Sequence, residues 1–420
     1  MRGALAALLC AAVAVGGCGS EVDPTPVPAR APLAIGITEG NPALLAPGTV
    51  PAAFAPWRDQ LAALRPRYVR VLVDWEKVQS QPGTPPRFDL PGDGCMRGIP
   101  PCAPNLGIRD VLRALGTRRA AGQPGWEPVV VLYGTPAWAA RRPFAPAPGG
   151  GDCRVSSRAR EPDPAAYRAF VEALRAEARD DGAPIRWWAP WNEPNHPAFL
   201  APQRARCAAD SPSQAAGRYA RIVRAFLAVQ ERGERILLGE TAGYDAPRAS
   251  ASSVAEFISG LPRDVVCASS TWAQHVYVAQ PGVVADDWSG APLAGDADAA
   301  GSPALLTAVF EALDRRGCPM RHRIWLTETG VGGPRPGRDR PTGDAALRRQ
   351  CQAMVAALAR WRRDPRIAAA LQYSFREDPA FPVGLADAGL TRRYAAYAAW
   401  LRGATTADDS SAGTTTCGAG

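Results

Sequence analysis

The chain has 420 residues, of which 46% are hydrophobic and 12 are tryptophan, a composition that excludes a disordered chain and supplies a large core. Its formal charge of +8 comes from arginines scattered along the sequence, with no basic block interleaved with aromatic residues, so no nucleic-acid partner is expected. An acidic polysaccharide or an anionic envelope surface stays open as a partner for this charge. The length exceeds the roughly 250 residues of one typical (β/α)8 barrel but is too short for two large enzymatic domains.

The first 18 residues have the pattern of a bacterial export signal. Met1-Arg2-Gly3 precedes the apolar stretch 4–15, which is too short to span a membrane as a stable helix. The next residues, Gly16-Gly17-Cys18, resemble a lipobox, in which the cysteine is lipidated; ordinary secretion with cleavage nearby is the alternative. We therefore expect an exported protein of the cell envelope or the medium, which contacts a membrane only through a lipid on Cys18.

After the signal, apolar β-like runs alternate with helical stretches rich in arginine and alanine. The alternation predicts repeated βα units and hence a (β/α)8 barrel. The expected strands are 33–37, 68–73, 128–133, 185–191, 235–239, 272–278, 323–327 and 369–375, and the expected helices include 164–179, 213–230, 302–316 and 344–363. The predicted organisation is a proline-rich tether at 19–32, one catalytic barrel domain with long loops at 33–403, and a polar tail at 404–420.

Export also decides how the cysteines are interpreted. Outside the signal and Cys18 there are eight, an even set in an oxidising compartment, which favours disulfides over metal ligation. Eight cysteines allow 105 pairings. The small loop between Cys95 and Cys102 favours that pair, and pairing in sequence order is the working hypothesis for the rest: Cys153 with Cys207, Cys267 with Cys318, and Cys351 with Cys417. No CxxC pair or histidine cluster indicates a metal site, and no cofactor is expected.

Two short carboxylate motifs each follow an apolar run. The sequence Trp191-Asn192-Glu193-Pro194-Asn195 ends the fourth expected strand, and Trp325-Leu326-Thr327-Glu328-Thr329-Gly330 ends the seventh. Each glutamate is therefore predicted where a strand emerges into a loop, which is the end of a barrel that carries the chemistry. Two carboxyl groups brought together there are the minimum apparatus for cleaving a glycosidic bond.

The two motifs together resemble those of the clan A glycoside hydrolases, retaining enzymes with a (β/α)8 barrel. The WNEPN and WLTETG forms look most like family 39 and related families, with family 5 next, and the resemblance spans roughly residues 33–402. It implies that Glu193 is the general acid/base, that Glu328 is the nucleophile, and that a β-linked oligo- or polysaccharide is hydrolysed through a covalent glycosyl-enzyme intermediate. The alternatives are a transglycosidase and a non-catalytic carbohydrate-binding protein of the cell surface.

The resemblance also implies supporting residues. Arg70 matches a second-strand arginine that bonds the nucleophile, although a structural buried salt bridge is the plainer interpretation. Asn192 matches an asparagine that contacts the sugar 2-hydroxyl. His275 and Tyr277 lie on one face of the sixth strand and match active-site residues, the tyrosine orienting the nucleophile.

Three further residues at strand ends are weighed on chemistry alone. Asp74 is a candidate hydroxyl binder or a solvated loop residue, and the flat ring of Trp138 is a candidate for stacking on a sugar or for ordinary core packing. Glu240, after the fifth expected strand, matches neither catalytic role. We expect a monomer.

Overall fold

The computed structural model describes residues 33–47, 52, 54–90, 107–144, 153–279, 303–332, 344–378, 383–386 and 417. The predicted signal, the predicted tether, the tail apart from Cys417, and the pair Cys95 and Cys102 lie outside these residues, so those predictions stay predictions. None of the helices in the described ranges has the length and apolar character needed to cross a membrane.

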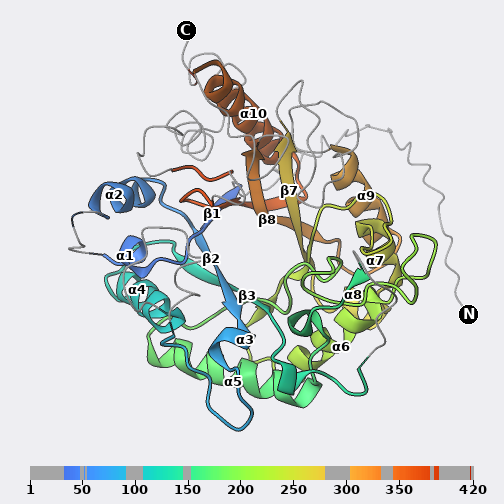
Figure 1. The fold of residues 1–420 in the computed structure, drawn as a ribbon. Helices are drawn as coiled ribbons and strands as arrows, with labels where there is room; N and C mark the ends of the chain where they lie inside the picture. The colour runs from blue at the N-terminus through green and yellow to red at the C-terminus, as the bar shows by residue number, and fades with distance from the viewer. Residues whose placement is uncertain are drawn as a thin grey trace, which may run out of the picture. The chain divides into compact units, whose positions relative to one another are not determined.

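The strands of the described chain form one parallel sheet in the order β5-β4-β3-β2-β1-β9-β8-β7-β6 (Figure 1). Their bounds are β1 Ala34–Thr38, β2 Tyr68–Asp74, β3 Glu127–Tyr133, β4 Trp187–Ala189, β5 Arg235–Ile236, β6 Leu238–Thr241, β7 Thr271–Ala279, β8 Arg323–Gly332 and β9 Ile367–Tyr373. Only Leu237 separates β5 from β6, and its N–H donates to the Trp188 carbonyl at 2.8 Å. The sheet therefore closes into the predicted (β/α)8 barrel, with β5 and β6 sharing the place of one strand.

Several expected strand ends were wrong. The fourth strand is only Trp187–Ala189, since Pro190 has no N–H to give to a ladder. The fifth is broken at Leu237, where the chain exchanges β4 for β7 as its pairing partner. The eighth stops at Tyr373, short of residue 375. The seventh continues to Gly332, because its pairing with β7 runs to that residue, so Glu328 lies on a strand instead of in a loop.

The larger helices surround the strands (Figure 1). The helices of the described residues are α1 Pro42–Leu45, α2 Ala55–Ala63, α3 Trp75–Val78, α4 Ile108–Ala120, α5 Pro164–Asp180, α6 Ala215–Leu227, α7 Val254–Gly260, α8 Arg263–Val266, α9 Pro303–Asp314 and α10 Asp344–Arg363. Helix α5 shows why they form: Asp163 caps its first turn by accepting from the N–H groups of Ala165 and Ala166. Its buried residues Tyr167, Phe170, Val171 and Leu174 follow helical spacing.

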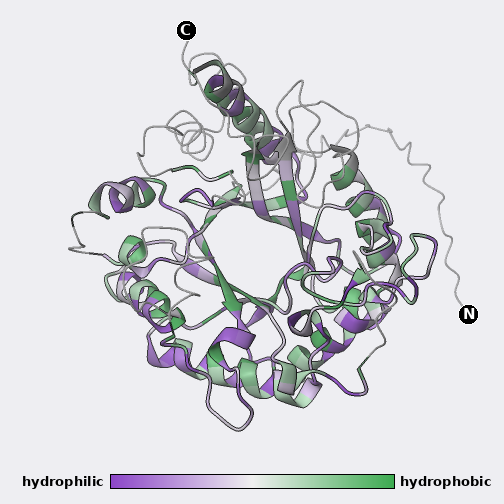
Figure 2. Ribbon diagram, viewed as in Figure 1, coloured by the Kyte–Doolittle hydropathy of each residue, from purple (hydrophilic) through white to green (hydrophobic). Residues whose placement is uncertain are grey.

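The side chains of β2 point alternately to the two faces of the sheet and so belong to two separate cores. Val69, Val71 and Val73 point outward into the layer between the sheet and the helices, while Tyr68 belongs to the cluster that fills the barrel. Figure 2 shows β2 and β3 as largely hydrophobic, in contrast to the mixed colouring of the surrounding helices. The same alternation points the Arg70 side chain into the barrel, above Tyr68.

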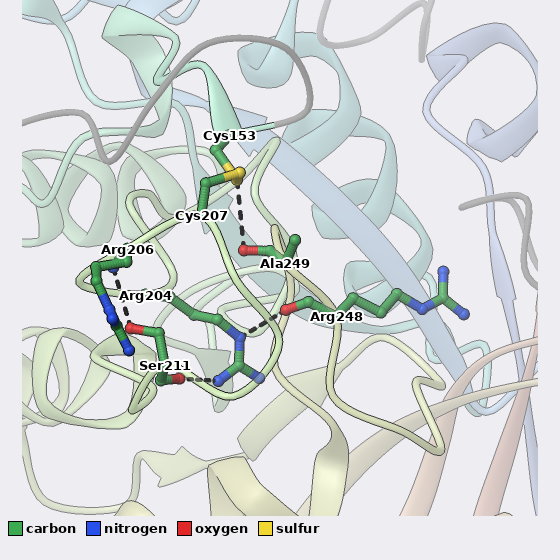
Figure 3. Close-up of a disulfide and its surroundings, with 7 residues drawn as sticks. All are labelled: Cys153, Arg204, Arg206, Cys207, Ser211, Arg248 and Ala249. Carbon is green, nitrogen blue, oxygen red and sulfur yellow. Dashed lines mark hydrogen bonds between the residues drawn. A yellow bond between two sulfur atoms is a disulfide. The ribbon is translucent and has the colours of Figure 1, made fainter.

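Within the described residues, disulfides join Cys153 to Cys207, Cys267 to Cys318 and Cys351 to Cys417, which confirms pairing in sequence order for these six cysteines. The first ties the segment after β3 to the segment after β4 (Figure 3). Beside it, Arg204 donates from Nε to the Arg248 carbonyl at 2.6 Å and also bonds the Ser211 carbonyl. The disulfide and the Arg204 bonds together link the segments after β3, β4 and β6, at the end of the sheet where the fourth-strand carboxylate motif lies.

Candidate active site

Five ionisable side chains and one amide meet at the C-terminal end of the strands. Each is buried, with at most 3% of its surface exposed. They are Arg70 on β2, Asn192 and Glu193 after β4, Glu240 on β6, His275 on β7 and Glu328 on β8. The register of β7 and β8 places His275 directly beside Glu328. We call these six residues the central network.

Arg70 is the cation at the centre of the network. Its Nη1 lies 2.7 Å from Glu328 Oε1, and its Nη2 donates to Asn192 Oδ1 and to Glu240 Oε2, both at 2.8 Å. Burial by itself would lower the pKa of Arg70, but the charges of Glu240 and Glu328 outweigh burial and raise it. The guanidinium therefore stays charged and holds two of the carboxylates.

His275 joins all three carboxylates. Its Nδ1 lies 2.8 Å from Glu193 Oε1 and 3.5 Å from Glu328 Oε2, and its Nε2 lies 2.8 Å from Glu240 Oε2. Burial by itself would lower the pKa of His275, but the Glu328 charge and the hydrogen bonds to Glu193 and Glu240 raise it to about 10. Both ring nitrogens are thus donors at neutral pH.

Glu240 is the member that the sequence left without a role. Its Oε2 accepts from both Arg70 and His275, and its backbone carbonyl accepts the Glu193 N–H at 2.8 Å. Burial by itself would raise the pKa of Glu240, but the Arg70 charge and the His275 hydrogen bond lower it to about 2. Its backbone φ of +51° is rare for a side-chain-bearing residue. In the sequence, the one feature that could have indicated Glu240 as a site residue is its position as an acid at the end of the apolar run 236–240.

Glu193 and Glu328 both approach Nδ1 of His275. One carboxylate oxygen of each glutamate and one ring nitrogen of His275 all lie within 4.8 Å of one another. Tyr277 donates its hydroxyl to Glu328 Oε2 at 2.5 Å, and burial together with the Glu328 charge raises the pKa of Tyr277, so the hydroxyl keeps its proton. Glu193 has a φ of +38°. Its backbone is therefore held in a sparsely populated conformation.

Glu193, His275 and Glu328 offer the types of ligand atom that bind a metal ion. However, both nitrogens of His275 face carboxylate oxygens at 2.8 Å, so a bound cation would have to displace the hydrogen bond from Nδ1 to Glu193. An imidazolium has no nitrogen lone pair for a metal. The arrangement therefore suits a proton-carrying network.

Among the described residues, neither Asp74 nor Trp138 forms a hydrogen bond or an ion pair with the network. Asp74 is fully buried and pairs with Arg158, so the solvated-loop interpretation was wrong. Trp138 donates from Nε1 to the Gln79 carbonyl at 2.9 Å, and its half-buried ring packs edge-on against Trp75 at 6.0 Å. The structure thus brings together the other predicted site residues but neither of these two.

No protein-family model matches this chain, and no curated protein matches its sequence. Solved structures do match. A family 39 glycoside hydrolase from Bacteroides cellulosilyticus WH2 is 15% identical with a TM-score of 0.50, the match covering 90% of this chain and 64% of that one. A GH5_18 structure from Bifidobacterium longum subsp. infantis is 16% identical with a TM-score of 0.51, covering 89% and 78%. A glucosidase from Croceicoccus marinus is 14% identical with a TM-score of 0.50, covering 89% and 67%.

These likenesses concern the fold. The chain shares the (β/α)8 barrel fold with these structures, which include members of families 39 and 5, the families that its motifs resemble. It spans less than two thirds of the length of the family 39 structure.

Proposed function

We propose that this protein is a retaining glycoside hydrolase that cleaves a β-linked oligo- or polysaccharide. The observation that carries the proposal is the close approach of Glu193 and Glu328: one carboxylate oxygen of each lies within 4.8 Å of the other at the C-terminal end of the barrel. Retaining glycosidases hold their two carboxyl groups about 5–5.5 Å apart, whereas inverting ones leave about 6.5–9.5 Å for a water molecule. The short separation favours retention.

The charges of the central network support the assignment of roles. Three carboxyl groups face two cations, so the network carries one excess negative charge when every group is ionised. One bound proton removes that excess. We assign it to Glu193, because Glu240 and Glu328 both contact the Arg70 guanidinium and are the better-stabilised anions.

The reaction then has two steps. In the first, Glu328 attacks the anomeric carbon, the bond from that carbon to the bridging oxygen breaks, and Glu193 gives its proton to the leaving oxygen. In the second, Glu193 takes a proton from water while the water oxygen attacks the anomeric carbon and releases Glu328. The first step leaves Glu193 ionised and ready to act as the base, and the second step returns Glu193 to its protonated form and frees the Glu328 carboxylate.

The remaining members hold these two glutamates in place. Arg70 and Tyr277 both contact Glu328, which fixes the direction from which it attacks. Glu240 holds Arg70 and His275 in one arrangement, so we propose it as a positioning residue. Asn192 is held by Arg70 through its amide oxygen, which leaves the amide N–H groups available to a sugar hydroxyl.

Reducing-sugar release from a panel of β-linked polysaccharides and aryl β-glycosides tests the proposal. We expect release by the parent and by E311Q, a matched control at an exposed glutamate of α9, and none by E328Q. The sugar released names the substrate class, and transfer products in place of free sugar would identify a transglycosidase. Binding without release by any variant would contradict the proposal and favour a carbohydrate-binding protein.

A further inference from the structure

Exposed arginines mark the opposite end of the barrel. Arg67 and Arg186 immediately precede β2 and β4, and Arg235 and Arg323 are the first residues of β5 and β8. All four side chains are exposed. Because the strands are parallel, the four residues lie together at the N-terminal end of the sheet.

Three of them form one patch around the aromatic rings of Tyr68 and Trp187. The Arg67 guanidinium lies 5.3 Å from the Tyr68 ring, and those of Arg186 and Arg235 lie 5.9 and 5.7 Å from the Trp187 ring. The two rings are 6.2 Å apart. The Arg235 N–H also donates to the Arg186 carbonyl at 2.7 Å. We call Arg67, Arg186 and Arg235 the arginine patch.

Acidic residues do not neutralise this patch. None of its three arginines forms an ion pair within the part of the chain that the structure describes, although a buried arginine of helix α5 does, Arg175, which pairs with Glu234 at 2.7 Å. Glu127, the first residue of β3, is an acid beside the patch and is only partly exposed. A cavity of about 420 Å³, lined by residues including Arg119, Arg186 and Glu127, opens next to it. The end of the barrel therefore carries excess positive charge and a hollow of the size that takes small ligands.

The path of the chain adds a second observation. Strand β1 begins at Ala34, so residues before it join the barrel at the same end as the arginine patch. The predicted tether 19–32 would reach at most about 45–50 Å when fully extended. A lipid on Cys18 would therefore attach to the barrel through this end of the chain, while a tether of that reach leaves the orientation of the barrel to other contacts.

We propose that the arginine patch binds the anionic phospholipid headgroups of a membrane surface. Each basic residue near such a surface adds attraction, and one lipid chain combined with a basic patch makes the attachment stable. Docked in this way, the barrel directs its candidate active site away from the bilayer. This proposal rests on the charges of the N-terminal end and is independent of the proposed hydrolysis.

Vesicle flotation of the mature chain carrying C18S, which has no lipid acceptor, tests the patch by itself. We expect binding to vesicles of equal parts phosphatidylglycerol and phosphatidylcholine, none to phosphatidylcholine alone, and release by salt as the Debye length shortens. The variant R67Q/R186Q/R235Q should lower the partition coefficient by roughly a hundredfold. The variant R67K/R186K/R235K keeps the charge and should keep binding.

The matched control is R142Q/R154Q/R206Q, which removes three exposed arginines from loops at the other end of the barrel and should leave vesicle binding unchanged. Circular dichroism melts would show that all variants fold. Equal loss in the patch and control variants, or no binding of anionic vesicles by the parent, would overturn the proposal. Patch-dependent binding of polygalacturonate without vesicle binding would also overturn it and indicate an acidic polysaccharide instead.

Discussion

The two ends of the barrel differ in whether their charged side chains are buried and paired. At the C-terminal end, three carboxyl groups and two cations are buried and contact one another at 2.7–2.8 Å. At the N-terminal end, the arginine patch is exposed and has no ion pair within the described residues. Buried charges interact strongly and depend on every partner, whereas exposed charges are screened by water and salt. The first arrangement suits bond-breaking chemistry, and the second suits contact with an extended anionic surface.

The largest expected effect comes from the nucleophile. E328Q keeps the shape of the side chain but removes the attacking carboxylate, so we expect kcat/KM to fall by about 10⁴–10⁶-fold. Initial rates of the parent, E328Q and the surface control E311Q measure this. Activity of E328Q close to that of the parent would show that the buried charges of this end serve structure alone.

Loss of the acid should be smaller and should depend on the leaving group. E193Q is expected to lower kcat/KM by about 10²–10⁴-fold on a sugar leaving group, because no proton reaches the departing oxygen. A nitrophenolate leaves without that proton, so the loss on a nitrophenyl glycoside should be much smaller. Equal losses on both substrates would argue against Glu193 as the acid.

Glu240 tests whether the network acts as a unit. Removing one partner of a buried ion pair costs roughly 3–5 kcal/mol, so E240Q should lower the free energy of unfolding by about that amount in urea titrations. It also removes a group that raises the pKa of His275, so the alkaline limit of kcat/KM should move to lower pH.

The matched control is E39Q, which breaks the equally buried pair of Glu39 and Arg376 outside the network. We expect E39Q to lose stability without moving the pH profile. An unmoved profile in E240Q as well would leave Glu240 a purely structural residue.

His275 should make stability depend on pH. Its folded-state pKa of about 10 lies above the ordinary value near 6.5, so the stabilisation is fully present below about pH 6.5 and is lost as pH rises towards 10. The difference in Tm between the parent and H275N should therefore shrink from pH 6 to pH 10. Burial lowers the pKa of His322, so H322N should show no such change above neutral pH.

The smallest effect is expected at the exposed end. R67Q/R186Q/R235Q removes contacts with the Tyr68 and Trp187 rings and should change the free energy of unfolding by no more than about 1–2 kcal/mol in total. Urea titration beside E240Q compares the two ends directly. A loss as large as that of E240Q would mean that the patch belongs to the core of the fold.

The sequence predicted the barrel because its apolar runs alternate with helical stretches, a pattern that local residues determine. It predicted Glu193 and Glu328 because each sits in a recognisable local motif. It assigned no role to Glu240, because that role depends on Arg70, 170 positions away, and only closure of the barrel brings the two together. It could not exclude a solvated Asp74 for the same reason, since the partner Arg158 lies 84 positions along the chain.

The stereochemistry of the reaction tests the central claim most directly. Proton NMR of the first product released from a β-linked substrate, recorded before mutarotation, distinguishes the two anomers. The close approach of Glu193 and Glu328 predicts that the β-anomer appears first and the α-anomer only later. Initial release of the α-anomer would mean inversion and would contradict the assignment of Glu328 as a nucleophile.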